Sequence, residues 1–114
     1  MNFKGEYDED ARLRESRKIL HKYPSRIPII VEKHDSCQFQ VVNKKKYLAP
    51  KDLTMNLFIF EIRKRIELEP SQSLFVTVNG KLVTSSHTLG EIYEKEADKD
   101  GFLYMIYTSE NTFG

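Results

Sequence analysis

One amphipathic helix between two regions of strand pattern most constrains the fold of this chain. The apolar residues of that helix recur at helical spacing: Met55, Ile59, Ile62 and Ile66. Thr54 is placed to cap the helix, and Pro70 stops the chain from continuing as helix. A helix with strands on both sides can bury its apolar face against a sheet, so we expect a sheet with a helix on one face.

The region before this helix contains strand patterns. Arg26–Lys33 alternates apolar residues with other residues and predicts a strand. Pro28 favours a sheet edge, a strand start or an irregular point within that strand. A second strand is expected over residues 40–43 or over residues 46–48.

The region after the helix predicts a hairpin and a last strand. Residues 74–78 are β-branched and aromatic, and Asn79-Gly80 is a strong hairpin signal because both positions tolerate positive φ. Residues 81–83 return along the hairpin. Thr88 and Glu91 form a capping-box pattern before a short helix, and a last strand is expected at residues 102–107.

Two helices are expected before the first strand. Residues 1–9 are weakly patterned and allow a short helix, and Asp10 is placed to cap a second helix that runs to about Lys22. The whole order predicts an α+β fold in one domain. Its strand-strand-helix-strand core is the β-grasp order of ubiquitin, here with two additional N-terminal helices.

Composition excludes several classes of function. The formal net charge of +1 gives no global field for nucleic acid or an anionic membrane, and no apolar run approaches the roughly 20 residues of a membrane span. The acidic residues of 91–100 are interpreted as a solvated face. Cys37 is the only cysteine, so a reducing compartment such as the cytoplasm is expected. The three histidines have no ligand spacing, so we expect no metal, no cofactor and no catalytic residue.

The chain ends with a predicted strand followed by a short polar tail, and its last residue is Gly114. Glycine has no Cβ to shield its carboxylate, so such a tail can enter a narrow cleft and be transferred to an amine.

Five segments stand out by their order and spacing: residues 22–33, 45–54, 62–66, 98–104 and 110–114. In these segments the chain resembles the ubiquitin-like autophagy modifier family, which includes the GABARAP proteins. The resemblance covers nearly the whole chain from Phe3 onward.

The resemblance implies three parts: an N-terminal helical extension (1–24), a ubiquitin-like β-grasp domain (25–109) and a flexible tail (110–114). It implies a modifier without enzymatic activity, whose Gly114 is joined to phosphatidylethanolamine by activating and conjugating enzymes. Family precursors often carry residues beyond the glycine, removed by a cysteine protease; this sequence has none. The implied locations are the cytoplasm and, after lipidation, the autophagosomal membrane.

The resemblance also implies partners that carry an aromatic residue, two intervening residues and an aliphatic residue, such as autophagy receptors and adaptors. The implied aromatic pocket consists of Glu15, Ile19, Pro28, Ile30, Lys46, Leu48 and Phe102. The implied aliphatic pocket consists of Tyr47, Ala49, Pro50, Leu53, Phe58 and Ile62. Arg26 and Arg65 are implied to meet acidic residues of the partner.

Alternatives remain at this stage. The residues alone favour an interpretation of Ile19, Ile30 and Phe102 as core, and nucleic acid competes weakly for the basic edge. Two rival functions are a soluble peptide-binding adaptor that is never conjugated and a small cysteine enzyme that uses Cys37.

The sequence departs from the family at three positions. Glu61 stands where an aliphatic residue usually lines the second pocket, and we expect it to pair with Arg65 four residues on. Ala49 is smaller than the usual valine. Thr77 stands where an aromatic residue is common and is expected on a surface.

Overall fold

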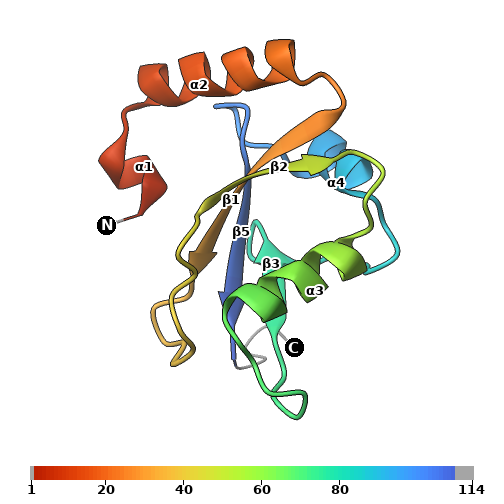
Figure 1. The fold of residues 1–114 in the computed structure, drawn as a ribbon. Helices are drawn as coiled ribbons and strands as arrows, with labels where there is room; N and C mark the ends of the chain where they lie inside the picture. Colours follow the sequence, from red (N-terminus) through yellow and green to blue (C-terminus); the bar gives the residue numbers. More distant parts are fainter. Residues whose placement is uncertain (1, 110–114) are drawn as a thin grey trace.

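The computed structural model describes residues 2–109. Four helices and five strands follow one another along the chain (Figure 1): α1 (Phe3–Glu6), α2 (Glu9–Lys22), β1 (Arg26–Lys33), β2 (Lys46–Pro50), α3 (Met55–Arg65), β3 (Phe75–Val78), β4 (Lys81–Leu82), α4 (Leu89–Glu96) and β5 (Leu103–Thr108). No helix among these residues is long and apolar enough to cross a bilayer.

The five strands form one mixed sheet in the order β2-β1-β5-β3-β4. β1 and β5 are parallel, and the other neighbouring strands are antiparallel. β2 and β4 are therefore the two edges, and β5 is the middle strand. The result is the predicted α+β fold of the ubiquitin type with two N-terminal helices.

The core is divided between the two faces of the sheet because side chains alternate along each strand. Ile29 and Val31 of β1 point into the larger cluster, to which α3 contributes Met55, Phe58 and Ile62, and its C-cap residue is Ile66, also in the cluster. Ile30, between them in sequence, points into a smaller cluster. Phe3 of α1 and Ile19 of α2 complete that smaller cluster with Phe102.

The first strand is confirmed with the predicted bounds. Pro28 lies inside β1, but pairing with β5 begins only at Ile29, so the missing amide of Pro28 falls just before that ladder. The second strand is Lys46–Pro50, and the alternative at residues 40–43 is wrong. There, the amide of Val42 and the carbonyl of Gln40 bond the Tyr107 hydroxyl instead of a neighbouring strand.

Most predicted helix and turn signals are confirmed. Thr54 caps α3, and Thr88 and Glu91 form a complete capping box. Asn79 and Gly80 both have positive φ, 52° and 77°, as the hairpin requires.

The cap of α2 differs from the prediction. Asp8, not Asp10, is the N-cap, and its side chain accepts a hydrogen bond from the amide of Ala11 at 2.8 Å. Asp10 lies in the first turn, where its charge still favours the helix N-terminus.

Candidate functional site

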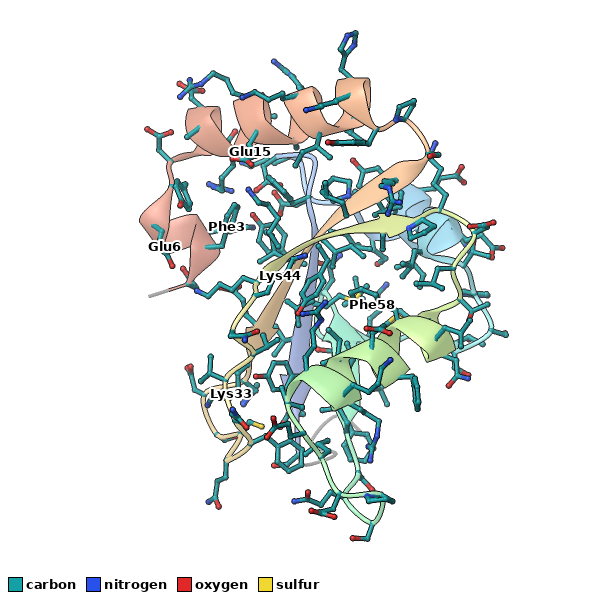
Figure 2. All side chains as sticks on the ribbon, in the orientation of Figure 1. Phe3, Glu6, Glu15, Lys33, Lys44 and Phe58 are labelled. Atoms are coloured by element: carbon teal, nitrogen blue, oxygen red, sulfur yellow. The ribbon has the colours of Figure 1, made fainter. Side chains whose placement is uncertain are left out.

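The strand β2 is an open edge of the sheet, and its side chains alternate between the two clusters. Tyr47 and Ala49 are buried in the larger cluster on the α3 side. Leu48 packs against the smaller cluster on the α2 side. Glu15 on α2 and Phe58 on α3 accordingly lie on either side of the β2 ribbon (Figure 2). The two residue sets predicted from the sequence thus lie on opposite faces of one edge strand.

The set predicted for the aromatic pocket gathers between α2, β1 and the start of β5. Ile30 and Phe102 are fully buried, and Ile19 is 8% exposed. Pro28 is buried, and Leu48 is partly buried. Ile19, Ile30 and Phe102 pack on one another as core, and Leu48 packs against them.

The polar members of this set lie at its rim. The Lys46 ammonium forms an ion pair with the Glu15 carboxylate, which joins β2 to α2. The side chains of both residues are about half exposed, so solvent screens the pair and its net stabilisation is small. Arg26 donates from Nη1 to the carbonyl of Leu48 at 2.9 Å. Both contacts are open to solvent.

The set predicted for the aliphatic pocket gathers between β2 and α3. Tyr47, Ala49, Phe58 and Ile62 are buried, and Leu53 packs against them. The rings of Tyr47 and Phe58 meet edge to face, with centroids 5.7 Å apart. Pro50 is exposed at the end of β2.

Two cations lie over the Tyr47 ring. The Arg65 guanidinium carbon lies 5.3 Å from the ring centroid, and the Lys44 ammonium nitrogen lies 5.2 Å from it. Burial raises the pKa of the Tyr47 hydroxyl, and the positive charge of Arg65 opposes part of that rise. Within residues 2–109 the Tyr47 hydroxyl has no hydrogen-bond partner. Positive charge beside an open strand edge suits an acidic peptide.

The predicted contact between Glu61 and Arg65 is wrong. Glu61 pairs with Lys64 at 2.9 Å, and its side chain is 48% exposed. The hydrogen bond from Lys64 and its charge lower the pKa of the Glu61 carboxyl. Arg65 instead covers Tyr47. Glu61 therefore lies in solvent beside the α3 cluster and is not buried in it.

Thr77 also departs from expectation. It is 2% exposed, and its hydroxyl donates to the carbonyl of Ile106 at 3.5 Å, so it belongs to the sheet interior and not to a surface. Sequence reasoning also missed Asp100, which it assigned to a solvated acidic face. Asp100 is fully buried, and no local pattern distinguishes it from the exposed acidic residues nearby.

Two further predictions concern other parts of the chain. Gly114 and the tail 110–114 lie outside the described residues, and β5 ends at Thr108. Cys37 is buried, and its sulfur accepts a hydrogen bond from the amide of Phe39 at 3.4 Å. In the part of the chain that the structure describes, no group of three or more His, Cys, Asp or Glu side chains is placed to hold a metal ion.

Solved structures share this architecture. The crystal structure of Trypanosoma brucei ATG8 is similar over 100% of this chain and 98% of its own, with a TM-score of 0.91 and 38% sequence identity.

Sequence comparison agrees with the structural likeness. This chain is 46% identical to autophagy-related protein 8 of Mycosarcoma maydis over 98% of this chain and 95% of that protein. It is 44% identical to autophagy-related protein 8i of Arabidopsis thaliana, over 99% and 98%. A sequence model described as "Autophagy protein Atg8 ubiquitin like" matches residues 11–114. The match to the family model, the sequence identities and the shared fold together show that the chain belongs to the Atg8 family of ubiquitin-like autophagy proteins.

Proposed function

We propose that this protein is a modifier joined through Gly114 to phosphatidylethanolamine, and that it recruits receptors and adaptors to autophagosomal membranes through β2. Membership of the Atg8 family supports the first part, together with the glycine at the end of the sequence. The protein is a substrate of activating and conjugating enzymes and of a cysteine protease that removes the lipid. It moves between the cytoplasm and the autophagosomal membrane.

The arrangement of β2 is the single observation that most supports the peptide-binding part. An edge strand offers unpaired amides and carbonyls, and an extended peptide can add to it as a further strand. Successive side chains of the added peptide point to opposite faces, so two anchors can reach the α2 side and the α3 side. Arg26, Lys46 and Arg65 bring positive charge to the same edge for acidic residues of the peptide.

The conjugation part is tested by reconstitution with the family's activating and conjugating enzymes, ATP and vesicles that contain phosphatidylethanolamine. The unmodified chain should shift in gel mobility and float with the vesicles. Deletion of Gly114 should abolish both effects, whereas Thr112→Ala, which keeps the terminal glycine, should preserve them. Conjugation of the Gly114 deletion would refute this part. A chain that binds peptide but is never conjugated would be the soluble adaptor.

The binding part is tested by titration with an aromatic-x-x-aliphatic peptide. Leu48→Ala removes a partly buried side chain on the α2 face of β2, and we expect about tenfold weaker binding. Leu82→Ala is the matched control, because Leu82 is exposed on β4, the opposite edge of the sheet. Equal loss in the two variants would place the peptide elsewhere.

A further inference from the structure

The carboxylate of Asp100 is fully buried just before β5 and accepts hydrogen bonds from three donors. Its Oδ2 accepts from Nη1 of Arg12 at 2.5 Å and from the hydroxyl of Tyr104 at 2.5 Å. Its Oδ1 accepts from the backbone amide of Phe102 at 2.9 Å. A buried charge with paired, well-placed donors is strongly disrupted when one partner is removed, so this group fixes its neighbours firmly.

The backbone around Asp100 is tied to the same helix. The Ser16 hydroxyl of α2 donates to the carbonyl of Asp100 at 2.6 Å. Gly101 follows with φ +90°, and a Cβ at that position would lie 2.3 Å from the Ser16 oxygen. Arg12 and Ser16 are one helical turn apart, so one turn of α2 contacts this loop directly.

The same loop is the connection to the aromatic set. Phe102 is two residues beyond Asp100, and Ile19 lies less than one turn beyond Ser16 on α2. These two apolar residues belong to the smaller cluster and come from its two sides, α2 and the segment before β5. Asp100 bonds to both segments: to α2 through Arg12 and to the segment before β5 through the Phe102 amide.

We propose that Asp100 is a positioning residue, which sets the separation between α2 and Phe102 and thereby the size of the aromatic side chain that the pocket accepts. This inference rests on the proposed peptide-binding function, since it assigns the selectivity of that same pocket. Asp100 itself does not line the pocket; it acts through Arg12, Ser16 and Phe102.

The electrostatics of the three side chains agree with this geometry. Burial raises the pKa of the Tyr104 hydroxyl, and its hydrogen bond to Asp100 raises it further. Burial alone would lower the pKa of Arg12, but the bonds to Asp100 and Tyr104 outweigh it and raise that pKa. Both donors thus keep their protons over the physiological range.

The donors that bond the Asp100 carboxylate lie on the α2 face of the sheet, which separates positioning from general stabilisation. Arg12, Ser16 and Phe102 lie on the α2 side, whereas Phe58 and Ile62 belong to the other cluster. Loosening α2 should therefore alter the selectivity of binding at the aromatic anchor and leave the selectivity at the aliphatic anchor unchanged. A role in stability alone would alter the selectivity at both anchors to the same extent.

The test is titration of the full chain and its Asp100→Asn variant with two series of peptides. One series carries tryptophan, phenylalanine or tyrosine at the first anchor, and the other carries leucine, valine or alanine at the second. In the variant we expect the affinity for peptides with an aromatic first anchor to fall about fivefold to tenfold. We also expect the differences in affinity among the tryptophan, phenylalanine and tyrosine peptides to become smaller. The ratios within the aliphatic series should stay unchanged.

The matched control is Glu96→Gln, which removes a carboxylate whose partner, Lys81 at 2.9 Å, is not a member of this network. It should leave both series unchanged. Arg12→Lys keeps a cation opposite Asp100 and should retain more selectivity than Asp100→Asn. Unchanged affinity ratios within the aromatic series in Asp100→Asn, or equally altered ratios within the aliphatic series, would overturn the positioning role.

A second measurement needs no peptide. The methyl NMR signals of Ile19 and Leu48 should shift in Asp100→Asn, and those of Leu53 and Ile62 should not. If the wild-type chain binds neither peptide series, the proposed function fails, and these signals alone decide the positioning role. If Asp100→Asn does not fold, Tyr104→Phe removes one donor and keeps the Arg12 pair, with the same readouts expected at smaller amplitude. Unmoved Ile19 and Leu48 signals in a folded variant would refute the inference.

Discussion

The hydroxyl of Tyr107 accepts a hydrogen bond from the backbone amide of Val42, 65 residues earlier in the chain, at 2.9 Å. The same hydroxyl donates to the carbonyl of Gln40 at 2.8 Å. Tyr107 is fully buried in the middle strand, so this contact fastens the loop between β1 and β2 to the core. The loop leads directly into β2, the strand on which the proposed peptide site depends.

Tyr107→Phe should lower the free energy of unfolding by roughly 1–3 kcal/mol, because it leaves the amide of Val42 and the carbonyl of Gln40 without their partner. Urea denaturation followed by circular dichroism measures the change. Tyr7→Phe is the control: Tyr7 is 47% exposed, and its change should stay within about 0.5 kcal/mol. Equal effects in the two variants would mean that the loop is not held by this hydroxyl.

Gly101→Ala should destabilise the chain more than Gly80→Ala does, by at least about 1 kcal/mol. Both glycines have positive φ, so both variants introduce backbone strain. Only at Gly101 does a new Cβ overlap another residue, Ser16 of α2; at Gly80 nothing lies within 4 Å. Thermal unfolding of the two variants compares them, and equal destabilisation would show that α2 adjusts freely.

Glu61→Leu should tighten binding of peptides with a leucine or isoleucine anchor by about 1 kcal/mol, the scale of burying one or two methylenes. Glu61 is bonded only to exposed Lys64, so its replacement breaks no buried pair. Peptide titration measures the gain, and Glu94→Leu, exposed on α4, controls for added surface hydrophobicity. Unchanged affinity for Glu61→Leu would mean that the aliphatic anchor does not reach this part of α3.

Cys37→Ser should be conjugated at the wild-type rate. The thiol is buried, and it contacts the amide of Phe39 rather than a catalytic base. Rates of conjugation in the reconstituted reaction provide the measurement, and Cys37→Ala controls for the added hydroxyl group. Complete loss of conjugation in a folded variant would revive the alternative that this chain acts through its own cysteine.

Local patterns predicted the elements whose signals lie within a few residues. The strand Arg26–Lys33, the cap at Thr54 and the hairpin at Asn79-Gly80 are of this kind. The choice between two positions for β2 was open because a side chain of the last strand, Tyr107, decides it.

The site was predictable to a smaller extent for the same reason. The resemblance supplied its residues, but the partner of Glu61 depends on the position of Arg65 over Tyr47. Asp100 is buried because Arg12, 88 residues away, docks on it. Such contacts depend on tertiary packing, and the residue types within a short window do not encode them.

The central position of β5 has a mechanical consequence. Its last residue, Thr108, lies at the end of the sheet far from α1 and α2, with ladders to β1 and β3 on its two sides (Figure 1). A pull along this strand from a membrane tether loads both ladders in shear, so their hydrogen bonds must rupture together rather than one after another. Resistance to such traction is set by the barrier to unfolding rather than by equilibrium stability. Under the function proposed above, the chain would bear tension between vesicle and cargo on its central strand, and its edge strand would stay available for exchange of partners.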